Sequence, residues 1–234
     1  MAVKSARPGK VAAYDAGCRA CPRLAGFLDD VRGDYPGYFC LPVPPFGAAD
    51  PRLIIVGLAP GLHGANRTGR PFTGDYAGIL LYATLHKFGF ATQPIAESVT
   101  DQLQLIDCRI TNAVKCLPPQ NKPLPAEIRT CNAFLKAELA ALPPATAILA
   151  LGTIAHAAVL TALGLKAGHG KFAHGHRHDL PGGRILFDSY HCSRYNTNTR
   201  RLTEAMFHAV FADIRAHLDR TGSVSGSGPK ANTA

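Results

Sequence analysis

The sequence predicts an α/β fold in which helices cover both faces of a parallel sheet. Four short runs of apolar and β-branched residues are continuous rather than alternating, which is typical of strands buried on both faces. These runs alternate with segments of helical periodicity, and such alternation is characteristic of a parallel sheet. The four predicted strands are RLIIVGL (52–58), RITNAV (109–114), TAILALG (146–152) and RILFDSY (184–190).

Three amphipathic segments supply the predicted helices. They span residues 76–89, 125–142 and 200–219, each with apolar residues at helical spacing. A chain of 234 residues, 47% of them hydrophobic, can bury a core of its own, so we expect residues 1–220 to form a single domain. The remaining stretch, residues 221–234, is rich in Gly and Ser without periodicity and predicts a flexible tail.

Charge and cysteine content narrow the class of protein. A formal net charge of +9 makes nucleic acid a plausible partner, although the excess could serve solubility alone. There is no run of 18 apolar residues and no apolar stretch at the start, so we expect neither a membrane span nor a signal peptide. The odd number of seven cysteines argues against a disulfide framework. We therefore expect a protein of the cell interior, not a secreted toxin or a receptor.

In parallel sheets, ligands bind beyond the carboxyl ends of the strands. The loop after the first predicted strand, GLAPGLHGANRTGRPFTGDYAG (57–78), contains six glycines and two prolines, which indicates that its backbone passes close to a ligand. Arg67 and Arg70 could bind phosphate or brace the loop by ion pairs. Phe72 could stack on a nucleobase or anchor the loop to the core. Asp75 could begin the next helix as its N-cap.

Polar side chains also follow the second and fourth predicted strands. Asn112 offers a donor and an acceptor side by side, which can pair with one edge of a nucleobase or with local backbone. The fourth strand leads into SYHCSRYNTNTRRLT (189–203), which could contact a phosphate backbone or only cap the helix that follows it. The polar residues of interest in that loop are His191, Arg194, Asn196, Arg200 and Arg201.

A histidine-rich segment, GHGKFAHGHRHDL (168–180), invites a metal-site interpretation. In a strand, three of its histidines would share one face, but no carboxylate or cysteine is apparent to complete a good site. Surface or DNA-facing roles are therefore the favoured interpretation, and a metal-dependent hydrolase is the less favoured one. The four histidines are His169, His174, His176 and His178.

Three of these segments together resemble the B-type, or family 5, uracil-DNA glycosylases. The motifs GLAPGLHGANRTGRPFTGD, TNAVKC and HCSRYNTNTRRLT occur in the order that the family has and at the ends of the expected strands. The resemblance covers roughly residues 15–218. Cys192 departs from it, because the third motif usually has proline after the histidine.

The resemblance implies a three-layer α/β/α sandwich with a central four-stranded parallel sheet. It also implies a monomeric enzyme of the bacterial or archaeal cell interior, associated with the nucleoid. That enzyme would remove uracil from DNA without a metal at the reacting centre, with hypoxanthine and other deaminated bases as further candidate substrates. The alternative is a non-catalytic iron–sulfur protein that binds damaged DNA.

This interpretation assigns a role to each candidate residue. We expect Asp75 and His191 to be catalytic, with Asp75 orienting water or stabilising the sugar cation and His191 donating a hydrogen bond to the leaving base. The expected base-binding residues are Phe72, Asn112, Gly57, Ala59 and Asn196. The expected DNA-binding residues are Arg67, Arg70, Arg194, Arg200 and Arg201.

Related glycosylases carry a [4Fe–4S] cluster on four cysteines, and the resemblance implies a structural cluster here. The matching positions are Cys18, Cys21, Cys116 and Cys131. Four thiolates would also suit zinc, and Cys131 could simply belong to the core.

Overall fold

A computed structural model describes residues 14–143 and 145–224. Its centre is one six-stranded sheet with the strand order β1-β3-β2-β4-β6-β5. The four inner strands are parallel, and the two edge strands run antiparallel to their neighbours. The strands are β1 (Phe46–Gly47), β2 (Leu53–Gly57), β3 (Cys108–Asn112), β4 (Ala147–Leu151), β5 (Arg177–Asp179) and β6 (Ile185–Ser189).

The four inner strands confirm the predicted parallel sheet. The observed strands β2, β3, β4 and β6 begin within one residue of the predicted starts. They end within two residues of the predicted ends. All residues of β2, β4 and β6 are buried, as continuous apolar runs predict for strands covered on both faces. The sequence did not predict β1 and β5, since two or three residues are too few to show a periodicity.

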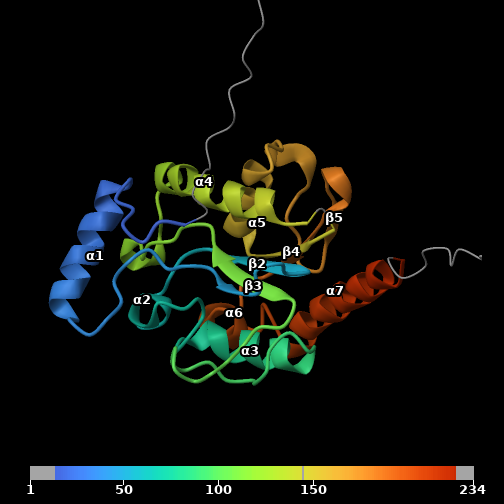
Figure 1. Cartoon of the computed structure of the whole chain (residues 1–234), viewed down its shortest axis with the longest axis horizontal. Coiled ribbons are helices and arrows are strands. Elements are labelled where there is room, and N and C mark those ends of the chain that lie inside the picture. The colour runs from blue at the N-terminus through green and yellow to red at the C-terminus, as the bar shows by residue number, and fades with distance from the viewer. Residues whose placement is uncertain (1–13, 144, 225–234) are drawn as a thin grey trace, which may run out of the picture.

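Helices cover both faces of the sheet, as Figure 1 shows. Helices α4 and α5 lie on one face, and α3, α6 and α7 lie on the other, with α1 at one side of the sheet. The helices are α1 (Pro22–Asp34), α2 (Ala65–Thr68), α3 (Tyr76–Lys87), α4 (Pro125–Ala141), α5 (Thr153–Ala162), α6 (Arg194–Asn198) and α7 (Glu204–Val224).

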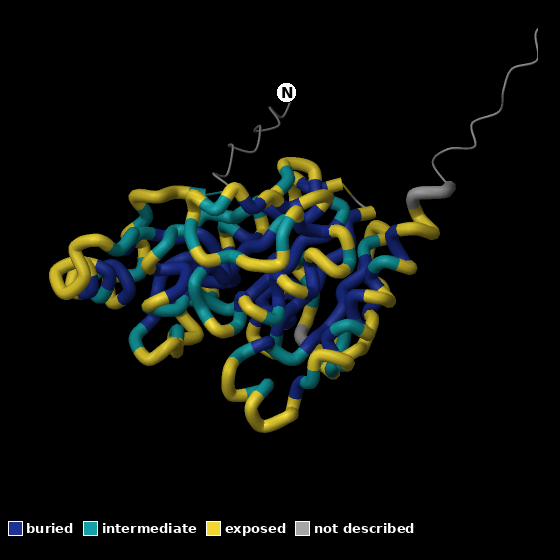
Figure 2. The backbone as a smooth tube through the Cα atoms, turned by 90° about the horizontal axis from the view of Figure 1, so that it is seen from below, coloured by how far each residue is buried: buried dark blue, intermediate teal, exposed yellow. Residues whose placement is uncertain are grey.

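Alternate residues of each inner strand face opposite helical layers. In β2, Leu53 and Ile55 join the core cluster shared with α3 and α7, whereas Ile54 and Val56 join the cluster shared with α4 and α5. Figure 2 shows the resulting buried interior beneath an exposed outer layer of loops and helix faces. Burial of this kind contributes about 25 cal/mol per Å² of apolar surface, which fixes the strands and the loops that leave them.

The three predicted helices are present with shifted bounds. Helix α7 begins at Glu204 rather than near Arg200, because residues 194–198 form the separate short helix α6. Helix α7 also continues to Val224, so the first four residues of the predicted tail are helical. The rest of that tail lies outside the described residues. None of the helices in residues 14–143 and 145–224 has the length and apolarity of a membrane span.

Candidate active site

A pocket of about 430 Å³ opens where the parallel strands end. In the register of β2 and β3, Gly57 lies opposite Asn112, so the loops that follow these two strands leave the sheet side by side. The loop after β6 closes the pocket from a third direction. The predicted site residues that line it are Ala59, Phe72, Asp75, Asn112, His191 and Arg194.

Asn112 lines this pocket and carries an unpaired acceptor. Its side chain is 3% exposed, and its Oδ1 has no hydrogen-bond partner among the described residues. A buried polar atom without a partner costs about 1–3 kcal/mol, which the fold would avoid unless a ligand restores the bond. Local backbone pairing, the alternative role for Asn112, therefore does not account for Oδ1.

Gly57 makes the close packing under Asn112 possible. A Cβ atom at Gly57 would lie 2.4 Å from Asn112 Oδ1 and 2.8 Å from the Phe72 ring. Any larger residue would displace both side chains from the pocket wall. Gly57 thus lies behind the pocket rather than lining it, and it determines where Asn112 and Phe72 lie.

Phe72 and His191 form two aromatic walls. Their ring centroids are 5.8 Å apart with a 31° angle between the planes. Phe72 has a positive φ of 54°, a conformation that is unfavourable for a bulky residue and is concentrated at functional sites. It is also 6% exposed and packs in the core, so it anchors the loop while one face of the ring borders the pocket.

Burial lowers the pKa of His191 to about 4. The imidazole is therefore neutral near pH 7, with one N–H available as a donor. Within residues 14–143 and 145–224, its ring nitrogens make no hydrogen bond with another residue. A neutral donor without a protein partner is suited to a ligand oxygen that gains negative charge.

Asp75 caps a helix and also borders the pocket. It is the N-cap of α3, where its Oδ1 accepts a hydrogen bond from the Gly78 N–H at 2.8 Å. Burial raises the pKa of the Asp75 carboxyl, against the effect of these backbone hydrogen bonds. Oδ2 lies against Gly64, where a Cβ would be only 2.5 Å away. One carboxylate oxygen is thus anchored, and the carboxyl group borders the pocket.

The loop that carries His191 is stiff despite the absence of proline. Cys192 is completely buried in the core. Asn196 donates from Nδ2 to the His191 carbonyl oxygen at 2.8 Å, and Ser193 caps α6 by accepting from the Asn196 N–H. Asn196 therefore lies behind His191, and the structure places it as a support of the loop rather than in the pocket wall.

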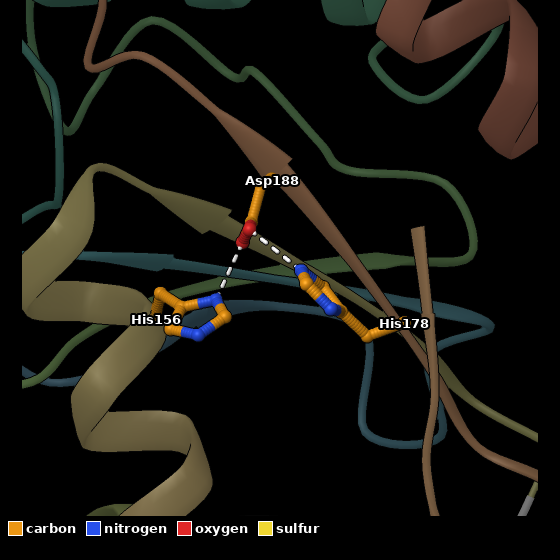
Figure 3. Close-up of side chains that lie close together, drawn as sticks. All are labelled: His156, His178 and Asp188. Atoms are coloured by element: carbon orange, nitrogen blue, oxygen red, sulfur yellow. Dashed lines mark hydrogen bonds and ion pairs between the residues drawn. The ribbon is translucent and has the colours of Figure 1, made fainter. Parts of the chain in front are cut away.

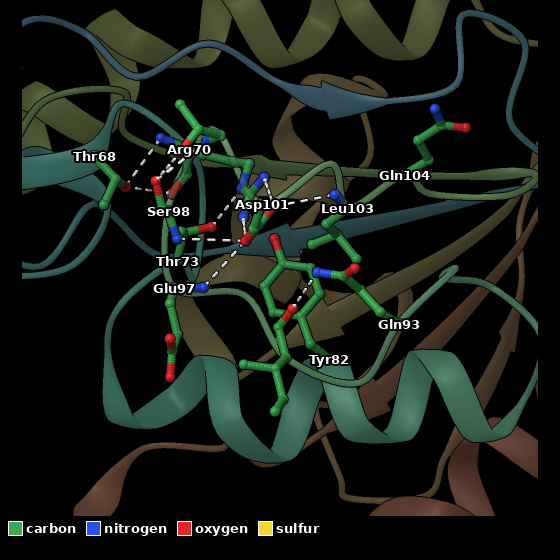
Figure 4. A network of polar contacts seen from close by, with 12 residues as sticks. Thr68, Arg70, Thr73, Tyr82, Gln93, Glu97, Ser98, Asp101, Leu103 and Gln104 are labelled. Atoms are coloured by element: carbon green, nitrogen blue, oxygen red, sulfur yellow. Dashed lines mark hydrogen bonds and ion pairs between the residues drawn. The ribbon is translucent and has the colours of Figure 1, made fainter.

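Arg70 is buried, which does not fit its predicted role in binding DNA. Its guanidinium forms a two-pronged ion pair with Asp101, at 2.9 and 2.5 Å, and Nε donates to Thr73 Oγ1. The side chain is 6% exposed and stacks over the Phe46 ring. Figure 4 shows Arg70 and Asp101 at the centre of a connected polar network. Arg70 braces the first loop, which was the alternative role.

The other four predicted DNA-binding arginines lie at the surface. Arg194 and Arg201 stack over aromatic rings, Arg194 over Tyr76 and Arg201 over Tyr190. Arg67 donates from Nε to a backbone oxygen of its own loop. Arg200 has a positive φ of 57° at the turn after α6. All four are exposed on the segments that follow β2 and β6, and Arg194 also lines the pocket.

The four predicted cluster cysteines line one cavity of about 200 Å³. Burial and the neighbouring thiols raise the pKa of Cys116 to about 12, which agrees with four thiols gathered in one place. Within the described residues, no three of these sulfurs lie within 4.8 Å of one another. Four cysteine thiolates hold iron–sulfur clusters and also zinc, so these residues fit either group.

The histidine-rich segment is only partly a strand. His178 lies in β5, whereas His174 lies in the turn before it. His174 stacks on Tyr190, and its Nδ1 accepts the Tyr190 N–H at 3.1 Å, so it supports the residue before His191. His178 contacts Asp188, so the prediction that no carboxylate accompanies these histidines is wrong.

Two further residues at the pocket had not been predicted. Tyr76 lies in the pocket wall and supports the guanidinium of Arg194. Ser193 lines the pocket and caps α6. Tyr76 directly follows Asp75, and Ser193 lies two residues after His191. Their proximity in the sequence to predicted site residues could have identified them as part of the site.

Fold and pocket together define an α/β domain with a ligand site at the carboxyl ends of its strands. The sequence model of the uracil DNA glycosylase superfamily matches residues 44–215. The chain belongs to this superfamily.

Relatives place the chain in one branch of it, the type-5 enzymes. It is 46% identical over 204 residues to a type-5 uracil-DNA glycosylase of Thermus thermophilus, covering 85% of this chain and 92% of the relative. A type-5 uracil-DNA glycosylase of Mycobacterium leprae is 44% identical, with 85% and 90% covered. A type-4 uracil-DNA glycosylase of Thermotoga maritima is 34% identical over 59% of this chain and 58% of its own.

Proposed function

We propose that this chain is a DNA-repair enzyme, a monofunctional glycosylase. It extrudes uracil, or another deaminated base such as hypoxanthine, from DNA and hydrolyses the N-glycosidic bond to leave an abasic site. The observation that carries the proposal is the unpaired Asn112 Oδ1 in a pocket walled by Phe72 and His191. The names of the type-5 relatives and the net charge of +9 support DNA as the partner.

The extruded base binds between Phe72 and Asn112. Phe72 offers an aromatic face at the pocket wall, which favours a flat ring by stacking. Asn112 Oδ1 accepts the N3–H of uracil, and the amide of Asn112 donates to the neighbouring carbonyl oxygen. Ala59 borders the base beyond the end of β2, and Gly57 keeps Asn112 and Phe72 in place behind it. Pairing of Asn112 with one edge of the base confers the base preference.

Cleavage breaks the bond between C1′ of the sugar and N1 of uracil. The electron pair of this bond leaves with the base, whose negative charge spreads to the carbonyl oxygens. Neutral His191 stabilises that charge by donating its N–H, an interaction of about 3–4 kcal/mol in preorganised sites. The oxygen of a water molecule bonds to C1′, and the proton that this water loses neutralises the departing uracil anion, either directly or through solvent. Asp75 orients this water and stabilises the cationic sugar with its free oxygen.

The exposed arginines bind the DNA backbone around the pocket. Arg67 lies on the loop after β2, and the others lie on the loop after β6. Each phosphate contact releases counterions and makes affinity depend on salt. The arginines of the second loop are Arg194, Arg200 and Arg201. We expect the enzyme to act as a monomer of one domain, within the cell and at the nucleoid.

Cys18, Cys21, Cys116 and Cys131 would hold a structural [4Fe–4S] cluster. Cys18 and Cys21 lie just before α1, Cys116 follows β3, and Cys131 lies on α4. When bound, the cluster supplies four iron–thiolate bonds that tie these segments together. Through Cys116 it would fix the chain a few residues after Asn112.

Incubation with uracil-containing DNA tests the proposal. End-labelled duplexes with a single uracil, and matched duplexes with thymine, are incubated with the protein in EDTA and then heated in alkali to break abasic sites. We expect cleavage at uracil only. Protein that binds the DNA and retains its iron but leaves uracil and hypoxanthine intact would indicate the non-catalytic alternative.

Replacement of Asn112 tests which residue reads the base. Asn112→Asp should change the relative rates on uracil and hypoxanthine DNA by about tenfold or more, since the loss of one matched hydrogen bond costs about 1–3 kcal/mol. DNA affinity should stay within about twofold. Asn132→Ala offers a matched buried control on α4, where Nδ2 donates to the Ala158 carbonyl. An unchanged base preference in Asn112→Asp would contradict the assignment.

A further inference from the structure

Three buried side chains from three elements converge beneath α5. His156 comes from α5, His178 from the edge strand β5 and Asp188 from the inner strand β6. They are 4%, 7% and 0% exposed. Figure 3 shows both imidazoles directed at the same carboxylate. None of the three lines the reaction pocket.

The carboxylate lies between two ring nitrogens. His156 Nδ1 is 2.8 Å from Asp188 Oδ1, and His178 Nε2 is 2.8 Å from Asp188 Oδ2. These ligand atoms all lie within 4.8 Å of one another, and they form the one such set among the described residues. Two imidazoles and one carboxylate are a donor set that zinc and other divalent transition metals prefer.

The second nitrogen of His156 indicates how the ring is protonated. Nε2 lies 3.1 Å from the Gly170 carbonyl oxygen, which can only accept, so Nε2 carries a proton. In a neutral imidazole, Nδ1 is then a lone pair that faces the Asp188 carboxylate at 2.8 Å. Two acceptors at this distance repel unless a positive charge lies between them. A proton shared between the two groups, or a metal ion bound between them, removes this repulsion.

The surroundings resemble those of a metal site. Metal-bound histidines generally donate their other nitrogen to a backbone carbonyl or a carboxylate, as His156 does to Gly170. Asp188 Oδ2 also accepts a hydrogen bond from the Ala173 N–H at 3.3 Å. A Cβ at Gly170 would lie 2.5 Å from His178 Nδ1, so glycine allows the backbone to contact both histidines at once.

We propose that His156, His178 and Asp188 bind a divalent transition metal ion, with zinc as the probe. Ligands 2.8 Å apart, each about 2.0–2.1 Å from the metal, subtend about 90° at the ion. Because a tetrahedral ion needs wider angles between its ligands, its binding moves the two rings slightly away from the carboxylate. The ion joins α5 and the edge strand β5 to the inner strand β6, so its role is to stabilise this side of the sheet.

Cobalt and zinc binding to the whole protein, with its cysteine site loaded, tests this site. The protein is dialysed against a chelating resin, and Co²⁺ or Zn²⁺ is added anaerobically. We expect one additional Co²⁺ per chain, with visible d–d bands but no sulfur-to-metal charge-transfer band, which separates this site from the cysteines. Zinc should also raise the melting temperature, because it binds the folded state.

Single replacements assign the ligands. His178→Gln and His156→Gln should each weaken zinc binding by more than about 100-fold, since even an outer-sphere partner contributes 10–100-fold, and should abolish the zinc-dependent rise in melting temperature. His169→Gln, in the neighbouring segment, should change neither. Binding that survives both replacements would overturn the proposal.

The wild-type protein remains informative even if a variant fails to fold. If it binds no Co²⁺ or Zn²⁺ outside the cysteines, the positive charge is a proton and the proposal is wrong. The proposal is also wrong if NMR of the metal-treated protein shows His156 with a proton on both ring nitrogens.

Discussion

Two polar regions border the loop after β2 and differ in how completely they are paired. All three nitrogens of the Arg70 guanidinium donate to an acceptor. The Asp101 carboxylate also accepts hydrogen bonds from backbone N–H groups. At the pocket, Asn112 Oδ1 is unpaired, and the His191 ring makes no hydrogen bond to another described residue. Because unpaired buried groups are costly, the paired region stabilises the fold, whereas the unpaired region can still form hydrogen bonds to a ligand.

The largest effect should come from breaking the paired region. Arg70→Met leaves the Asp101 carboxylate without its charge partner, and removal of one partner from a buried pair costs about 3–5 kcal/mol. We expect the free energy of unfolding, measured in urea, to decrease by an amount that approaches this cost. The excision rate per folded molecule should be nearly unchanged. Arg67→Met, on the exposed side of the same loop, is the control. Full stability in Arg70→Met would remove the distinction between the two regions.

Replacements in the unpaired region should affect catalysis instead. His191→Ala should slow single-turnover excision by about 100–1000-fold, since one preorganised donor is worth about 3–4 kcal/mol. Asp75→Ala should slow excision as well, with DNA affinity within about twofold in both variants. Exposed Asp50→Ala is a matched control. Excision at the wild-type rate by Asp75→Ala would show that Asp75 is only a helix cap.

Lowering the pH should change the stability of the fold in opposite directions through two carboxylates, Asp101 and Asp75. The Arg70 guanidinium and backbone N–H groups lower the pKa of Asp101 to about 2, against the effect of burial. Its contribution to stability is therefore present above the ordinary pKa and is lost as pH falls from about 4 to about 2. We expect a loss of about 2 kcal/mol, because each unit by which the folded-state pKa is lowered corresponds to about 1.4 kcal/mol.

Burial raises the pKa of Asp75, so protonation of this group has the opposite sign and favours the folded state. Both effects can be measured by urea unfolding between pH 2 and 5. The proteins compared are the wild type, Asp101→Asn and Asp75→Asn. The loss between pH 4 and 2 should be smaller in Asp101→Asn than in the wild type. An identical loss would mean that the ion pair contributes nothing at acid pH.

The smallest effect belongs to the exposed arginines. Arg200→Ala removes at most one phosphate contact, so the slope of log affinity against log salt should decrease by about 1. Excision at saturating DNA should be unchanged. Fluorescence anisotropy measures the affinity at several salt concentrations and so gives this slope. Arg70 is left out of the series of arginine variants because it is buried. An unaltered slope would place Arg200 away from the DNA backbone.

Much of the fold was predictable because burial on both faces leaves a local signal. The inner strands are continuous apolar runs, and the three main helices repeat apolar residues at helical spacing. The edge strands β1 and β5 were not predicted, because strands of two and three residues depend on pairing with a neighbour. The short helices α2 and α6 likewise depend on caps within loops.

The site was predictable as a set of residues but not as a set of roles. Sequence placed Asp75, Asn112 and His191 at the ends of strands, where a parallel sheet brings them together. It could not distinguish Arg67 from Arg70, since both are arginines of one glycine-rich loop. Only the tertiary structure, in which Asp101 lies against Arg70, decides that one is buried and the other exposed.

The sequence by itself determined the parallel sheet, the loops that leave it and the family resemblance. These depend on residues that are neighbours along the chain, so local patterns record them. The tertiary structure alone decided the pairing of groups distant in sequence: Asn196 behind His191, Asp101 against Arg70, and Asp188 between His156 and His178. Hydrogen bonds and ion pairs act only over a few ångströms, and folding alone brings those groups within range.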